Sequence, residues 1–185
     1  ILKAFYGVLK SADRYLRFIF LTGVTKFSKV SVFSDLNQLN DISMDYDSGT
    51  ICGITHQELE LNFEPEIKTL AKANGMTEDE VITQMTRQYD GYHFHPYADG
   101  VYNPFSVLSA FYKKEFGNYW FQTGTPTFLV KSLQKADYDL RTLMDGVEAS
   151  ASTFTEYRAE ADNPLPLIYQ SGYLTIKDFD KGFKM

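Results

Sequence analysis

Residues 17–43, RFIFLTGVTKFSKVSVFSDLNQLNDIS, decide how the rest of the chain is interpreted. The short apolar run at 18–21 combines aromatic and β-branched residues, which is typical of a strand buried on both faces of a parallel sheet. The run stops at Thr22 and Gly23, and the following loop carries Lys26 among small hydroxyl residues. Because ligands bind at the carboxyl ends of strands in open α/β sheets, we look first to this loop for chemistry. The alternative is an ordinary core strand followed by an incidental lysine.

The composition favours a globular domain, or two small ones, with an aromatic-rich core. The chain has 185 residues, of which 15 are Phe and 13 are Tyr. It carries 18 basic and 24 acidic residues, a formal net charge of −6, so broad binding to nucleic acid or anionic membranes is not expected. A single cysteine, Cys52, rules out an internal disulfide and fits a cytoplasmic location. No apolar run approaches the ~20 residues that span a bilayer.

Six sequence blocks together resemble the AAA-ATPase-like family. They follow the family's order from about Phe5 onward and read TGVTKFSKVSVFSDLNQLNDIS, ICGITHQEL, YDGYHF with YNPFSVL, YWFQTGTPTFLV and LIYQSGYLTIKDFD. The resemblance implies a divergent branch of P-loop ATPases, found largely in bacteria of the gut and often followed by a nuclease domain of the PD-(D/E)XK type. The resemblance therefore implies ATP and Mg²⁺ as ligands of the intact protein.

The resemblance also implies that the phosphate-binding part lies elsewhere. Family members carry a phosphate-binding loop and an acidic magnesium-binding strand upstream of these blocks, but this chain has no GxxxxGK[ST] sequence. Because it opens at Ile1 without a methionine, we expect the C-terminal part of the ATPase, which binds no cofactor and hydrolyses no ATP by itself. Its expected partners are the upstream ATPase core and a downstream nuclease-like domain of the same polypeptide.

The loop after the first strand is the expected nucleotide sensor. A cation at the end of a strand stabilises γ-phosphate charge, so Thr22, Thr25 and Lys26 are the sensor-like residues. Without the other parallel strands this strand would be an unpaired edge, and we expect it to pair irregularly or to mediate self-association.

Two capping boxes predict helices in the middle of the chain. Thr55 with Glu58 predicts a short helix at 56–61, and Thr77 with Glu80 predicts a longer one ending before Asp90. Between them a helix at 65–73 is expected, so that the two longer helices form an antiparallel pair. The faces expected to be buried are Ile67, Leu70 and Ala71 on one helix and Val81, Ile82, Met85 and Tyr89 on the other.

An aromatic loop at 89–103 leads into a proline-started helix. Asp99–Gly100 is a hairpin-type turn signal that predicts a small ribbon between 92–94 and 101–102. Asn103 and Pro104 predict the start of a helix with a buried stripe made by Phe105, Leu108, Phe111 and Tyr112. The position of Pro104 is similar to the Gly-x-Pro element of signalling ATPases, which implies that Tyr102 and Pro104 approach adenine. A plain proline-capped helix is the alternative.

The C-terminal segment has the layout of a winged helix. A helical pattern after Pro164 ends at Gly172, and a strand at 173–176 is followed by a turn and a return strand from Phe183. The nearby charges are mainly acidic, which disfavours phosphate contacts.

These observations predict a mainly α fold: a helical lid and a winged-helix-like end with small β-hairpins, plus one strand remnant of a P-loop α/β sheet. The expected domains are a core remnant at 1–50, the lid at 51–147 and the truncated winged-helix-like end at 148–185. The expected function is a nucleotide-dependent switch. The alternatives are a protein-interaction module using exposed aromatic loops at 89–102 and 119–121, and a DNA-binding winged helix.

Overall fold

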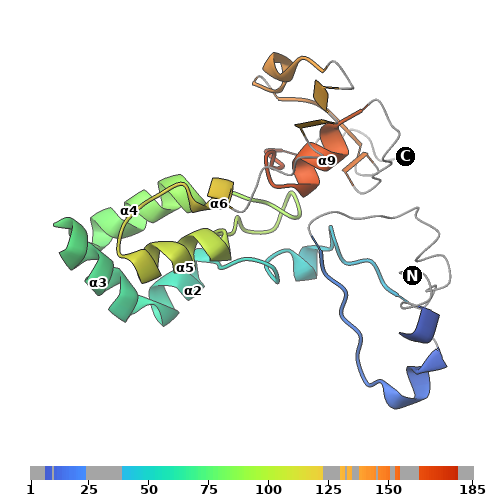
Figure 1. Ribbon diagram of the computed structural model, residues 1–185, viewed down its shortest axis with the longest axis horizontal. Coiled ribbons are helices and arrows are strands. Elements are labelled where there is room, and N and C mark those ends of the chain that lie inside the picture. The colour runs from blue at the N-terminus through green and yellow to red at the C-terminus, as the bar shows by residue number, and fades with distance from the viewer. Residues whose placement is uncertain are drawn as a thin grey trace. The chain divides into compact units, whose positions relative to one another are not determined.

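The computed structural model describes most of the middle of the chain and parts of both ends (Figure 1). The described residues are 7–9, 11–23, 39–122, 130–131, 133–134, 138–144, 146–150, 153–154 and 163–178. The chain divides into two compact units, one formed by 1–41 with 128–174 and the other by 42–127 with 175–185. The described residues are mainly helical, as predicted, and their β structure is confined to isolated bridges.

Six α-helices and three 3-10 helices are fully bounded within the described residues. The α-helices are α2 (His56–Asn62), α3 (Glu64–Asn74), α4 (Glu78–Tyr89), α5 (Pro104–Lys113), α6 (Tyr119–Gln122) and α9 (Leu165–Gln170). The 3-10 helices are η1 (Asp13–Tyr15), η2 (Tyr46–Ser48) and η3 (Leu140–Leu143).

Both predicted capping boxes are confirmed. The hydroxyl of Thr55 accepts a hydrogen bond from the Glu58 amide at 3.2 Å, and the Glu58 carboxylate accepts one from the Thr55 amide at 2.9 Å. Thr77 and Glu80 repeat the arrangement at 3.2 and 2.8 Å. Each box satisfies amides that the first turn of a helix leaves without an intrahelical acceptor, which fixes where α2 and α4 begin.

Helices α3, α4 and α5 lie side by side around one core (Figure 1). Gly75 ends α3 in the left-handed conformation, with φ 66°, and lets the chain turn directly into α4. The predicted inward residues of α3 and α4 are buried, except that Ile82 is only half-buried. The core consists of Leu59, Ile67, Leu70, Ala71, Val81, Met85, Tyr89, Tyr102, Val107, Ala110, Phe111 and Tyr119.

The face of α5 that is buried differs from the predicted stripe. The helix buries Ser106, Val107, Ala110 and Phe111, whereas Phe105, Leu108 and Tyr112 are 48%, 52% and 88% exposed. Small side chains at the contact allow α5 to lie close to α3 and α4, which a row of large rings and leucine would prevent. Of the predicted stripe, only Phe111 is buried.

The predicted ribbon around Asp99–Gly100 is present as a single antiparallel bridge between Tyr92 and Val101. A second antiparallel bridge, which the sequence pattern did not indicate, joins Tyr102 to Ile54. The Tyr102 amide donates to the Ile54 carbonyl at 2.8 Å, and the Ile54 amide donates back at 3.2 Å. This second bridge fixes the segment before α5 beside the segment before α2.

The predicted buried strand at 18–21 is wrong. Residues 16–23 have no strand pairing, and Phe18 is 80% exposed with its ring stacked 6.3 Å from that of Phe20. A strand requires a neighbour for its backbone hydrogen bonds, and the described part of the chain places none beside this run. Upstream, residues 7–9 and 11 are helical.

Near the C-terminus, α9 confirms the helix predicted after Pro164, and the turn that follows it contains the predicted Gly172. Gly172 adopts φ 80°, and the Tyr173 amide returns to the Ile168 carbonyl at 3.0 Å. The predicted strand at 173–176 is not formed, and Phe183 lies outside the described residues. The winged-helix arrangement therefore stays a prediction.

A small second core surrounds α9 and contains Leu167, Ile168, Leu133, Leu143, Tyr173 and Leu174.

Candidate functional site

The sensor-like residues fall at the edge of the described part of the chain. Thr22 is exposed in irregular backbone, and Thr25 and Lys26 lie outside the described residues. Their joint role as a phosphate sensor therefore stays a prediction.

Tyr102 is the centre of a polar network that reaches the surface, since its partners His56 and Thr86 are exposed. Its side chain is fully buried, and its hydroxyl lies 2.8 Å from His56 Nδ1 and 2.7 Å from Thr86 Oγ1. The rings of Tyr102 and His56 are stacked with their centroids 6.1 Å apart. Pro104, the first residue of α5, lies two residues away and is half-buried. The network thus joins α2, α4 and the segment before α5.

Counting hydrogen-bond donors fixes the direction of each bond in this network. Thr86 also lies 2.9 Å from the Ile82 carbonyl, which can only accept, so the threonine proton is used there. The Tyr102 proton must then go to Thr86 Oγ1, and His56 Nδ1 must carry the proton that it donates to Tyr102. All three contacts are satisfied only when His56 is protonated at Nδ1.

A surface hollow of about 450 Å³ lies beside this network, and we call it the acidic hollow. It is lined by Thr55, His56, Gln57, Glu60, Asp90, Asp99 and Gly100. Glu60 Oε1 lies 3.5 Å from His56 Nε2. Asp90 Oδ1 is buried, and no described residue donates a hydrogen bond to it. Three carboxylates thus line a hollow to which neither lysine nor arginine contributes.

Electrostatics at the network reflect the same acidic surroundings. Burial raises the pKa of the Tyr102 hydroxyl, and the hydrogen bond with Thr86 partly opposes this shift. The negative charges of Asp90 and Glu60 raise the same pKa further, because they disfavour a second anion nearby. Tyr102 is therefore a neutral hydrogen-bonding group, and the field around it is negative.

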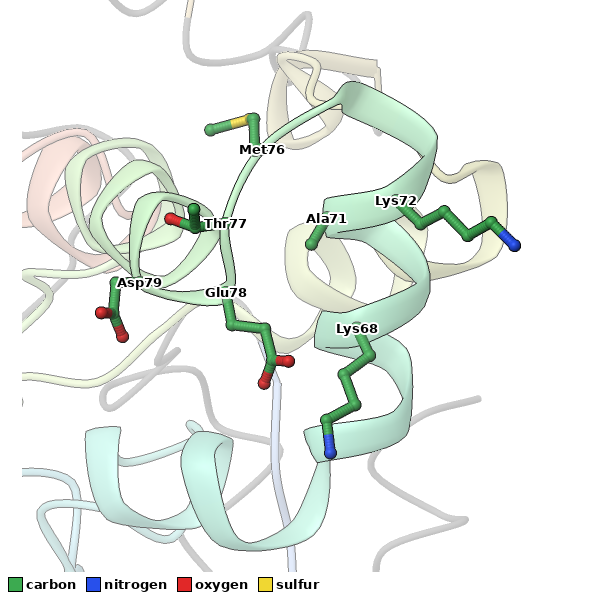
Figure 2. Close-up of a pocket in the computed structure, with 7 residues that line it drawn as sticks. All are labelled: Lys68, Ala71, Lys72, Met76, Thr77, Glu78 and Asp79. Atoms are coloured by element: carbon green, nitrogen blue, oxygen red, sulfur yellow. The ribbon is translucent and has the colours of Figure 1, made fainter.

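A second hollow, of about 570 Å³, lies between α3 and the start of α4 (Figure 2). It is lined by Lys68, Ala71, Lys72, Met76, Thr77, Glu78 and Asp79. Lys68 pairs with Glu64, Thr77 serves the capping box, and Lys72 extends away from α4 in Figure 2. This mixed-charge notch contains none of the predicted site residues and is accounted for by the packing of two helices.

The sequence pattern missed most of the residues around Tyr102. The sequence pattern places position 56 only at the start of a short helix and Asp90 only after a longer one, and it assigns no role to Thr86. They come together through the bridge between Ile54 and Tyr102, which no local spacing reveals.

In the described part of the chain no group of three or more His, Cys, Asp or Glu residues is arranged to hold a metal ion. Among these residues, too, no helix is long and apolar enough to cross a membrane.

Comparison with known proteins finds one family model that matches the start of the chain. Residues 1–33 match the family model described as Predicted AAA-ATPase. The matched segment includes Thr22, Thr25 and Lys26. This match, which covers the first 33 of the 185 residues, supports an assignment to the AAA-ATPase-like family.

One similar protein is described as an uncharacterized protein in the vnfD 5' region of Azotobacter chroococcum mcd 1. It is 39% identical over 175 residues, which cover 95% of this chain and 31% of the relative. The chain thus spans about a third of the length of this relative. No solved structure matches the chain.

Proposed function

We propose that the chain is the lid and winged-helix-like portion of a bacterial nucleotide-dependent switch, and that it is not catalytic alone. The observation that carries this proposal is the AAA-ATPase family match at residues 1–33. The absence of a phosphate-binding loop from the printed sequence agrees with it. ATP and Mg²⁺ would then be held by an upstream ATPase core of the same polypeptide.

In this proposal the loop at 22–26 senses the nucleotide. Lys26 would stabilise negative charge on the γ-phosphate, while Thr22 and Thr25 would provide hydroxyl contacts. Pro104 would lie nearest the base, and the buried Tyr102 would hold the segment that leads into α5. Movement of the helical unit would then be passed to a downstream nuclease-like domain.

The test is ATP turnover by full-length protein carrying Lys26→Ala. We expect turnover to fall, because the substitution removes the charge proposed to stabilise the γ-phosphate, and an unchanged far-ultraviolet circular dichroism spectrum would show that the fold is retained. Lys72→Ala is the matched control, since Lys72 is exposed on α3. Turnover that survives Lys26→Ala unchanged would remove Lys26 from the mechanism.

Equilibrium dialysis separates the role of the chain from that of the whole protein. Labelled ATP should be retained by the full-length protein and not by residues 1–185, because the phosphate-binding loop is expected upstream. Retention of ATP by residues 1–185 alone would contradict the proposal that the nucleotide is bound by an upstream ATPase core.

The exposed face of α5 favours a second candidate, a protein-interaction module. Phe105, Leu108 and Tyr112 form this α5 apolar face, whereas Tyr102 and Tyr119 of the expected aromatic loops are buried. Interaction would therefore use mainly the helix, together with Tyr97 of the first loop, which is 50% exposed. Chemical cross-linking of the full-length protein in cells should give an adduct that Leu108→Glu abolishes while ATP turnover is unchanged. Persistence of the adduct would reject this candidate.

A further inference from the structure

Three aromatic side chains lie together where η2 meets the loop between α4 and α5, and we call them the ring cluster. Tyr46 belongs to η2, whereas His95 and Tyr97 belong to the loop. The ring centroids of Tyr46 and His95 are 5.5 Å apart, and those of His95 and Tyr97 are 5.6 Å apart. Tyr46 is 58% exposed and Tyr97 is 50% exposed. The cluster is therefore accessible from solvent.

A close backbone approach holds the two parts of the ring cluster together. Gly49 is buried, and a Cβ atom at this position would lie 2.5 Å from the Ala98 Cβ, closer than two such carbon atoms can approach. The Ala98 amide donates to the His95 carbonyl at 3.2 Å, which closes the turn that carries His95 and Tyr97. Only glycine allows η2 to lie so close to this turn. The rings are thus brought together by the fold, from segments that are distant in sequence.

The rings of the cluster meet at steep angles. The planes of Tyr46 and His95 are inclined by 76°, and those of His95 and Tyr97 by 54°. A planar ligand such as a nucleobase would stack on one of these faces at a time. An edge-to-face pair instead leaves a corner bounded by two ring faces, and a rounded cation in that corner contacts the negative face of both rings. The geometry therefore suits a rounded cation better than a flat ligand.

The charges around the ring cluster also favour a cation. The Tyr97 amide donates to His95 Nδ1 at 3.1 Å, so this nitrogen carries no proton and the imidazole is neutral. The stretches that supply the rings, 39–67 and 88–112, contain no lysine or arginine. Asp45 and Asp47 flank Tyr46 and are exposed. An anionic ligand is therefore disfavoured at these rings.

We propose that the ring cluster binds a trimethylammonium group. This group is rounded and permanently charged, and it has no N–H donors, so ring faces bind it without a hydrogen-bond acceptor. A primary ammonium or a guanidinium needs acceptors, and Asp45 Oδ1 already accepts from the Asp47 amide at 3.2 Å. The two carboxylates then contribute through their charge and not through direct contact.

The direct test is ligand-observed saturation-transfer NMR of choline with the full-length protein. The methyl protons of choline should receive saturation from the protein. The control ligand is 3,3-dimethylbutan-1-ol, in which carbon replaces the charged nitrogen, and it should bind about fivefold more weakly or less well still. Absence of choline binding, or equal binding of the neutral alcohol, would overturn the proposal.

Substitution of the tyrosines locates the site. Tyr46→Leu should weaken choline binding by about two- to fivefold, because it removes a ring face, and adding Tyr97→Leu should weaken it further. Tyr46→Phe keeps the ring and should bind as the parent does. Tyr112→Leu, at an 88% exposed position on α5, is the matched control and should also leave binding unchanged. Undiminished binding by the double variant, or equal losses with Tyr46→Phe and Tyr46→Leu, would overturn the assignment.

The source of the trimethylammonium group is decided by comparing choline with Nα-acetyl-Nε-trimethyl-L-lysinamide. Tighter binding of the lysine derivative would indicate a methylated side chain of a protein, and tighter binding of choline would indicate a small molecule. Unmethylated Nα-acetyl-L-lysinamide should bind more weakly than its trimethylated form. Equal or tighter binding of the unmethylated form would overturn the preference for a quaternary ammonium.

Discussion

The phenol of Tyr102 carries a stability prediction. Replacing it by phenylalanine removes the partner of both His56 Nδ1 and Thr86 Oγ1 and leaves the ring in place. We expect Tyr102→Phe to lower the free energy of unfolding by about 0.5–1.5 kcal/mol, the usual net contribution of a hydrogen bond, because His56 and Thr86 are exposed and water can replace the lost phenol. Urea unfolding followed by circular dichroism measures this loss. Tyr112→Phe, at an 88% exposed position, is the control and should change nothing.

The carboxylate of Glu58 carries a pH prediction. Hydrogen bonds from the amide and then the hydroxyl of Thr55 hold the pKa of Glu58 below its ordinary value of 4.5. A carboxyl group whose pKa is lowered by folding stabilises the protein above the unfolded value, and this stability is lost as the pH falls through the folded value. The excess stability of the parent over Glu58→Gln should therefore shrink as the pH drops below 4.5. A difference independent of pH would show that the charge of Glu58 contributes nothing.

At the level of elements, α5 offers a paired test of which face is buried. Val107 is fully buried, whereas its neighbour Leu108 is 52% exposed. Val107→Ala should lower the free energy of unfolding by about 1–3 kcal/mol through lost burial and a new cavity. Leu108→Ala should change it by less than about 0.5 kcal/mol, as exposed substitutions usually do. The reverse order of effects would restore the face predicted from the sequence.

The same helix shows where sequence reasoning works and where it fails. The start of α5 was predictable, because Asn103 and Pro104 act within one turn, and the Asn103 side chain accepts from the Ser106 amide at 2.9 Å. The buried face of α5 was not predictable. The helical pattern of large apolar residues indicates a different face from the one that carries Ser106 and Ala110. The choice is made by α3 and α4, which need small residues for close approach.

At the level of the whole molecule, the failures concern contacts between distant segments. The run at 18–21 has the composition of a strand, but composition supplies no pairing partner, and the described residues provide none. The network around Tyr102 depends on the bridge to Ile54, which is 48 residues away in sequence. No local sequence pattern indicates that the run at 18–21 lacks a strand partner or that Tyr102 forms a bridge with Ile54.

The net charge of the whole chain gives a prediction about nucleic acid. With a formal charge of −6, the 185-residue protein should not bind a labelled DNA duplex in fluorescence anisotropy, even at low salt, where phosphate contacts are strongest. Basic residues gathered on one face would be needed to overcome this repulsion. Binding that weakens steeply with added salt would contradict the prediction and favour the DNA-binding winged helix.

The α5 apolar face has a practical consequence for anyone who studies this protein. Phe105, Leu108 and Tyr112 offer a ready surface for environment-sensitive dyes such as ANS while the helices remain folded. Strong dye fluorescence from a fresh sample would then report native helix α5 and not a molten globule. Melting curves recorded with such dyes would start from a raised baseline, so spectroscopy of the backbone is the sounder assay for the variants.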